Sequence, residues 1–248
     1  MHERPTQPRG DDVGLRSAPQ MREYHALVQR IAADAPASIL DWGCGLGQVS
    51  ALLLEAGLNV SSFDYRGDDS PDDVVAMKLF PQVRAYVSSD PRALPYDDDS
   101  FDAVLSCGVL EHVLDPDASL DELARILKPG ATLYVYKLPN RFSYLEKLAK
   151  RMGLYFHGAE PHELLYTPAS ARELLERHGY EIRELRLANM LPLTLDIPIA
   201  QRPRVTAAVW GANTALARVP GLNRVATNVE LVATAPGSEC SPPQGGDR

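Results

Sequence analysis

Apolar residues along the chain follow two different spacings, and these predict the order of helices and strands. In residues 20–33 the apolar positions recur three and four apart, as on one face of a helix. Short apolar runs bounded by turn residues predict seven strands, over 38–42, 59–63, 83–87, 101–106, 131–137, 180–187 and 228–234. Further helices are predicted over 49–56, 117–127 and 168–178. Strands that alternate with helices indicate an α/β protein with a mostly parallel sheet.

The same pattern predicts one folded unit over residues 20–235. Residues 1–19 and 236–248 are rich in Pro, Gly, Asp and Arg and are predicted to be flexible tails. Residues 188–227 are apolar and interrupted by prolines, and we expect them to form an insertion between the last two strands.

Composition and charge narrow the class of protein. The 248 residues are 45% hydrophobic and carry a net charge of -8, which excludes a disordered chain and argues against a nucleic-acid partner. The three cysteines form no CxxC pair, so no zinc site or disulfide framework is predicted. The N-terminus lacks the apolar core of a signal peptide, and no uncharged apolar run reaches the length of a membrane span, so we expect a cytoplasmic protein.

A glycine-rich turn follows the first predicted strand and precedes a helix. It contains Gly43, Cys44, Gly45 and Gly47. Glycines let the backbone approach a ligand closely, and the N-terminus of the next helix favours an anionic group such as a carboxylate. Gln48 occupies the last glycine position of the dinucleotide fingerprint GxGxxG, so pyrophosphate recognition is disfavoured. A tight turn without a ligand is the alternative interpretation.

Acidic residues end the second and third predicted strands. Asp64 lies 21 residues after Gly43, where a carboxylate can accept hydrogen bonds from both hydroxyls of a ribose. Asp90 could accept a hydrogen bond from an adenine amino group, and Tyr65 could offer it an aromatic face. These features fit NAD and any other adenosine-containing ligand, and a solvated loop position is the alternative for each residue.

Together these segments resemble class I S-adenosylmethionine-dependent methyltransferases of the type 11 domain, nearest to those of the ubiquinone and menaquinone pathways. ILDWGCGLG at 39–47 looks like their first motif, FDYR at 63–66 like the end of their second strand, and residues 88–135 like the rest of their core. The resemblance implies a Rossmann-like, doubly wound, seven-stranded sheet with the last strand antiparallel and helices on both faces.

The resemblance also implies a cofactor site for S-adenosyl-L-methionine. Asp41, Gly43 and Gly45 would hold the methionine part in the turn that includes Cys44 and Gly47, and Cys107 would contact the same part through its backbone. Asp64 would hold the ribose with Tyr65 nearby, and Asp90, Pro91 and Arg92 the adenine. A sulfonium cation with an adenosine and no phosphate suits an acidic crevice with a glycine turn.

The methyl acceptor is expected beyond the fourth strand. The [ND]PP[YF] motif of enzymes that methylate adenine or glutamine is replaced here by Cys107-Gly108-Val109-Leu110. Glu111 and His112 resemble part of the ExxEH metal motif of some ubiquinone-pathway enzymes, but Gly108 replaces the first acid, so no metal is predicted. His112 is the candidate general base and Glu111 the residue that orients it. A histidine bonded to backbone and a carboxylate that complements a helix dipole are the alternatives.

These observations favour O-methylation of a small-molecule hydroxyl. Residues 191–222 are apolar and flanked by arginines, which suggests a cap for a lipophilic acceptor or contact with a membrane surface; a core-packing insertion or a dimer face is the alternative. A non-catalytic cofactor-binding module and, less favoured, an NAD(P)-dependent oxidoreductase are the competing functions. The oligomeric state is left open.

Overall fold

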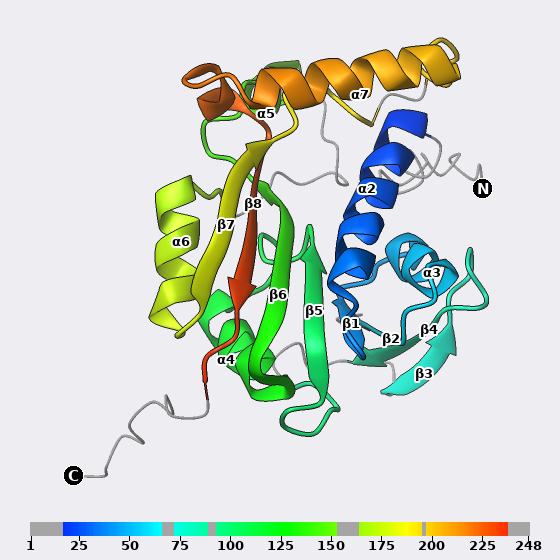
Figure 1. Ribbon diagram of the computed structural model, residues 1–248, viewed down its shortest axis with the longest axis vertical. Coiled ribbons are helices and arrows are strands. Elements are labelled where there is room, and N and C mark those ends of the chain that lie inside the picture. Colours follow the sequence, from blue (N-terminus) through cyan, green and yellow to red (C-terminus); the bar gives the residue numbers. More distant parts are fainter. Residues whose placement is uncertain (1–16, 66–71, 89–92, 153–163, 195–196, 238–248) are drawn as a thin grey trace, which may run out of the picture.

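The computed structural model describes residues 17–65, 72–88, 93–152, 164–194 and 197–237. An eight-stranded sheet in the order β3-β4-β2-β1-β5-β6-β8-β7 forms its centre (Figure 1). The strands are β1 (Ile39–Trp42), β2 (Val60–Tyr65), β3 (Asp73–Ala76), β4 (Arg84–Ser88), β5 (Phe101–Cys107), β6 (Leu127–Pro139), β7 (Glu181–Ala188) and β8 (Asn228–Thr234). The helices are α2 (Ala18–Asp34), α3 (Gln48–Glu55), α4 (Pro116–Ile126), α5 (Tyr144–Met152), α6 (Pro168–Arg177) and α7 (Pro203–Ala217), with a 3-10 turn, η1 (Leu222–Val225).

The predicted fold class is confirmed, with one strand more than expected. β8 runs antiparallel to both β6 and β7, as predicted for the last strand. The number seven was wrong because β3 adds an eighth strand, antiparallel to β4 at the sheet edge. This strand has four residues and no apolar alternation that would mark it, so only its pairing with β4 defines it.

Alternating side chains of the strands build a separate core on each face of the sheet. On one face Ile39 and Tyr134 pack with residues of α2 and α3. On the other face Leu40 and Leu133 pack with residues of α4 and α6. Successive residues along a strand point to opposite faces of the sheet, so apolar side chains are buried on both faces.

A second group of elements lies beyond one end of the sheet. α7 and η1 occupy the stretch between Ala188, where β7 ends, and Asn228, where β8 begins, and α5 lies at the same end (Figure 1). We call residues 141–152 and 197–227 the cap. In the described part of the chain, no helix combines the length and apolar character that a bilayer-spanning helix needs.

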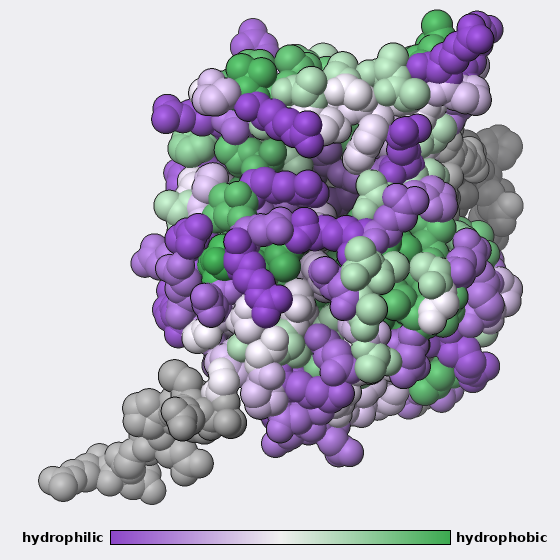
Figure 2. Space-filling view, in the orientation of Figure 1, coloured by the Kyte–Doolittle hydropathy of each residue, from purple (hydrophilic) through white to green (hydrophobic). Residues whose placement is uncertain are grey.

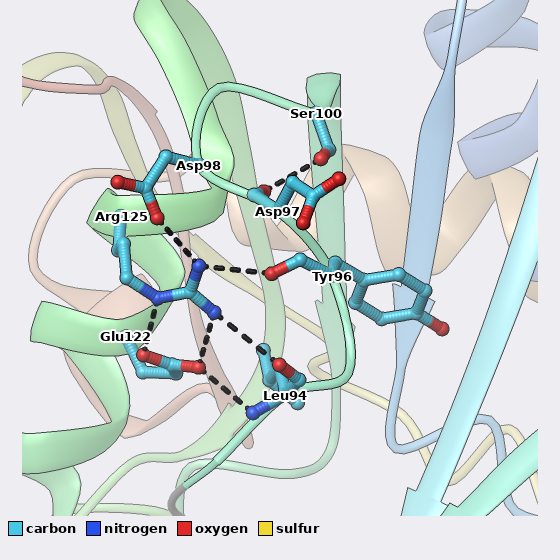
Figure 3. Close-up of polar contacts among 7 residues, drawn as sticks. All are labelled: Leu94, Tyr96, Asp97, Asp98, Ser100, Glu122 and Arg125. Carbon is cyan, nitrogen blue, oxygen red and sulfur yellow. Dashed lines mark hydrogen bonds and ion pairs between the residues drawn. The ribbon is translucent and has the colours of Figure 1, made fainter.

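Arg125 of α4 fixes the loop that leads into β5 (Figure 3). Its guanidinium donates two hydrogen bonds to Glu122, of 2.6 and 2.8 Å, and further bonds to the Tyr96 carbonyl and the Asp98 carboxylate. Glu122 in turn accepts the Leu94 N–H at 2.8 Å. Burial by itself raises the pKa of Glu122, but the bonds from Arg125 and Leu94 outweigh it and leave the pKa below its usual value. Arg125 therefore joins a helix to a loop through nearly all its donors.

We expect Arg125→Gln to lower the free energy of unfolding by about 1–3 kcal/mol, because it leaves Glu122 partly buried without its cation. Urea denaturation provides the measurement. Arg172→Gln is the matched control, since Arg172 forms an exposed pair with Glu176 one helical turn away, and it should cost less than about 0.5 kcal/mol. Equal losses in the two variants would contradict the role of Arg125.

Candidate functional site

The glycine turn predicted from the sequence connects β1 to α3 at the carboxyl end of the sheet. The N–H groups of Gly43 and Cys44 both donate to the Phe63 carbonyl of β2, each at 2.9 Å. Gly43 has φ of +75°, and a Cβ there would lie 2.5 Å from Val109, so only glycine fits. Gly45 has φ of +54°, and no heavy atom lies within 4 Å of the position that a Cβ would take on it, so it leaves open space beside the turn.

Asp41 lies beneath this turn and is almost fully buried. Its carboxylate accepts a hydrogen bond of 2.6 Å from Ser50 of α3, and the Ser50 hydroxyl accepts one of 2.8 Å from Ser62 of β2. Burial raises the pKa of Asp41 to about 6, the Ser50 bond opposes the rise, and the charge of Asp64 adds to it. Two carboxylates thus share one electrostatic environment, and a cation bound between them would relieve their repulsion.

The other predicted cofactor residues take different positions. Asp64 and Tyr65 end β2, beside the glycine turn, and the Tyr65 side chain is exposed. Gly47 is the N-cap of α3 and has φ of +85°. Asp90, Pro91 and Arg92 lie outside the described residues.

A pocket of about 280 Å³ opens at the carboxyl ends of β1, β5 and β6. Five of the predicted cofactor residues line it, namely Asp41, Gly43, Cys44, Gly45 and Cys107. Lys137 of β6 also lines it. Its other walls come from α2, the start of α5 and the segment after β7, with Gln20, Tyr24, Leu145, Asn189 and Leu191–Thr194 among them. Gly47, Asp64 and Tyr65 are not among the described residues that line it.

The two predicted catalytic residues have different surroundings. Glu111 is buried and lines the pocket, and its Oε1 lies 3.6 Å from the position of a Cβ on Gly108. His112 is exposed and does not line the pocket in the described structure. The Tyr166 hydroxyl donates to the Leu110 carbonyl at 3.2 Å, which anchors this turn. Glu111 is therefore the residue of the two that can meet a ligand in the pocket.

The thiols of the site are not activated. Burial raises the pKa of the Cys44 thiol, and the charges of Asp41 and Asp64 raise it further. Burial also raises the pKa of Cys107, although Lys137 opposes the rise. Both thiols stay protonated at neutral pH, so neither acts as a thiolate nucleophile. Among the described residues, no three His, Cys, Asp or Glu side chains gather as a metal site.

A buried polar network closes the pocket where α2, β6 and the cap meet. Glu23 of α2 pairs with the Lys137 ammonium at 3.0 Å and accepts hydrogen bonds from Gln20 and Asn189. Asn213 of α7 donates to Asn189 at 3.1 Å and accepts the Met190 and Leu191 N–H groups. Burial would lower the pKa of Lys137, but Glu23, with smaller contributions from Tyr24 and Cys107, raises the pKa above its usual value, so the ammonium stays charged.

This network was not predicted from the sequence. Lys137 lies near the end of β6, where it is largely buried and its Nζ is 4.4 Å from the centre of the Tyr24 ring. The helical pattern of 20–33 did hold a signal, because Glu23 falls beside Tyr24 and Leu27 on the buried face. A carboxylate on that face requires a partner, which the sequence could not identify.

Comparison with known proteins identifies the class of this fold and site. A sequence profile described as a methyltransferase domain matches residues 16–185. The chain is 37% identical over 111 residues to the demethylmenaquinone methyltransferase of Clavibacter sepedonicus, covering 44% of each protein. It is 36% identical over 110 residues to the ubiquinone biosynthesis O-methyltransferase of Xanthomonas oryzae pv. oryzae, covering 42% of this chain and 44% of the relative. The chain thus matches less than half the length of each relative.

Solved structures share the fold. A SAM-dependent methyltransferase from Thermotoga maritima superposes with a TM-score of 0.55 at 16% identity, covering 86% of this chain and 89% of that one. A SAM-dependent methyltransferase from Archaeoglobus fulgidus gives 0.51 at 19% identity, covering 85% and 92%. Fold and site thus define a Rossmann-like α/β methyltransferase. The chain belongs to the methyltransferase-domain family, and the resemblance to class I S-adenosylmethionine-dependent methyltransferases is confirmed.

The residues at and beside the glycine turn fit the cofactor of this family. Asp41 and Asp64 provide negative charge for a molecule with sulfonium and ammonium cations, and the N-terminus of α3 lies at the turn for its carboxylate. The open space beside Gly45 leaves room for a ligand against the backbone. The site therefore combines both signs of charge that a zwitterionic sulfonium requires.

The raised pKa of Asp41 predicts a specific pH dependence of stability. A raised pKa stabilises the fold below the unfolded value of 3.8, and this contribution is lost as pH rises through about 6. Asp41→Asn removes the titration, so its stability relative to the wild type should increase by about 1–3 kcal/mol between pH 4 and pH 7. Denaturation at several pH values, with the exposed Asp73→Asn as control, measures this. A difference that does not change with pH would refute the assignment.

Proposed function

We propose that the chain transfers a methyl group from S-adenosylmethionine to the hydroxyl of a small-molecule acceptor. One observation carries the proposal: a single pocket joins the glycine turn of β1 to Glu111 and Lys137 at the ends of β5 and β6. The groups to which we assign cofactor binding and proton acceptance thus face one space. When bound, the cofactor supplies an electrophilic methyl group.

The protein's own part in the reaction is alignment and proton removal. Asp41, the glycine turn and Asp64 hold the cofactor, while Glu111 accepts the proton of the acceptor hydroxyl. Lys137 keeps the pocket wall charged and ordered through its pair with Glu23. His112 is assigned no direct contact in this proposal, because its side chain is exposed.

The names of relatives support an oxygen acceptor. The Xanthomonas oryzae relative is called a ubiquinone biosynthesis O-methyltransferase, and a malonyl-[acyl-carrier protein] O-methyltransferase of Pseudescherichia vulneris is 30% identical over 131 residues. The apolar residues Leu145, Leu191 and Leu193 line the same pocket and favour an acceptor with an apolar body.

Mass spectrometry with methyl-labelled cofactor tests the proposal. The purified chain is incubated with phenols, quinols and sugars, and a product heavier by the labelled methyl group is expected from a hydroxyl acceptor. Binding of S-adenosylhomocysteine without turnover, on the panel or in cell extract, would instead indicate a non-catalytic module. Binding of NAD without S-adenosylhomocysteine would indicate an oxidoreductase.

Asp64→Asn should weaken S-adenosylhomocysteine binding by roughly 10- to 100-fold, which corresponds to about 1–3 kcal/mol for lost charge-assisted hydrogen bonds. Isothermal titration calorimetry measures the affinity. Asp73→Asn makes the same change on exposed β3 and should leave the affinity unchanged. The ribose assignment fails if both variants bind like the wild type.

Glu111→Gln should lower kcat by about 10²- to 10⁴-fold, the usual contribution of a general base, and change cofactor affinity little. The neighbouring His112→Asn should change kcat by less than about threefold, since that side chain is exposed. Rates across pH for both variants separate the roles. A larger loss in His112→Asn would transfer the proton-accepting role to His112.

A further inference from the structure

The cap exposes large apolar side chains to solvent. Seven of them are between 42% and 57% exposed: Phe142, Leu148, Met152, Ile197, Ile199, Val219 and Leu222. They belong to α5, to η1 and to the segments that flank α5 and α7, at one end of the molecule (Figure 1). Within residues 191–222, Leu193 and Ala200 are buried, but the exposed Ile197, Ile199, Val219 and Leu222 do not serve core packing. Clustered apolar exposure marks an interaction surface.

The same cap is strongly basic on an acidic protein. Eight of its exposed residues are cationic: Arg141, Lys147, Lys150, Arg151, Arg202, Arg204, Arg218 and Arg224. Its described residues include one carboxylate, Glu146, whereas the whole chain has a net charge of -8. Within the described structure, no ion pair joins any of the eight cations to an acid. The positive charge of the cap is therefore available to an external anionic partner.

The exposed face of α7 consists mainly of small, uncharged residues. Ala207, Ala208, Gly211, Ala212 and Ala215 are exposed, and Arg204 is the one charged residue of this helix. In Figure 2 pale green and green atoms run over α7 along the top of the view, with purple atoms at its ends. An apolar strip bordered by cations is the arrangement of a helix that lies in the interface of a membrane.

We propose that the cap docks on an anionic lipid bilayer, with its exposed apolar residues in the interface and its cations among the headgroups. A second copy of this chain fits less well, because a two-fold interface would bring the same eight cations face to face. A nucleic acid fits less well because seven large apolar residues would meet a phosphate backbone. A bilayer satisfies both the charge and the apolar surface.

Docking in this way places the pocket beside the membrane. Leu145 and Glu146 of α5 line it, as do Leu191 to Thr194 just before the exposed Ile197. A lipophilic acceptor could pass from the bilayer into the pocket without crossing water. This consequence rests on the proposed function, whereas the docking itself does not.

Vesicle co-sedimentation of the full chain tests the proposal. Vesicles of phosphatidylcholine with about 30% phosphatidylglycerol should bind the protein at least about tenfold more tightly than pure phosphatidylcholine. Raising the salt concentration to 0.5 M should weaken the binding, since the Debye length falls well below 10 Å.

Two pairs of variants locate the surface. Lys150→Glu with Arg151→Glu should reduce vesicle binding about tenfold or more, while Arg172→Glu with Arg183→Glu makes the same charge change away from the cap and should not. Ile199→Ser with Leu222→Ser should also reduce binding, with the salt dependence retained. None of the cap substitutions touches a pocket residue, so S-adenosylhomocysteine affinity should be unchanged in all of them.

Several outcomes would overturn the docking. These are no binding to anionic vesicles at low salt, equal losses in the cap and control charge variants, or a cap-dependent dimer in analytical ultracentrifugation without vesicle binding. Tight binding to duplex DNA or RNA in place of vesicles would do the same. Failure of methyl transfer with intact vesicle binding would refute the proposed function and leave the docking standing.

Discussion

The structure depends on one buried carboxylate, Glu23, where three parts of the molecule meet. It connects α2 to the end of β6 through Lys137 and to the end of β7 through Asn189, and Asn213 extends the network into α7. Removing one partner of a buried ion pair leaves an uncompensated charge, which is far more costly than the net stability of the intact pair. The helix, the sheet and the cap therefore have to adopt one mutual arrangement, and the pocket lies inside it.

Charge is distributed unevenly about that pocket. Asp41 and Asp64 crowd negative charge at the glycine turn, and the burial of Asp41 raises its pKa. The cap above carries the opposite sign. A cationic cofactor at the acidic end and an anionic surface at the basic end would each relieve repulsion present in the protein alone. The repulsion at the turn therefore lowers the stability of the protein alone, and binding of a cationic cofactor there would restore it.

Local signals predicted the parts of the site that lie on consecutive residues. Gly43 and Gly45 could be recognised because a strand, a turn and a helix follow one another within about a dozen residues. Asp64 could be recognised because β2 begins soon after the helix that follows the glycine turn, and ends beside the same turn. Lys137 could not, since its neighbours along the chain are strand residues and its partner Glu23 lies over a hundred residues away. β3 was missed for the same reason: its pairing with β4 defines it, not its own pattern.

The sequence by itself determined the α/β class and the glycine turn, because each follows from periodicity and turn residues over short stretches. The antiparallel last strand was implied by the resemblance to class I methyltransferases, not by any local pattern. Tertiary structure alone decided that Glu111 lines the pocket while His112 faces solvent, and that Lys137 is largely buried. It also decided that Ile197, Ile199, Val219 and Leu222 are exposed. Burial is a property of what packs against a residue, and that partner usually lies far along the chain.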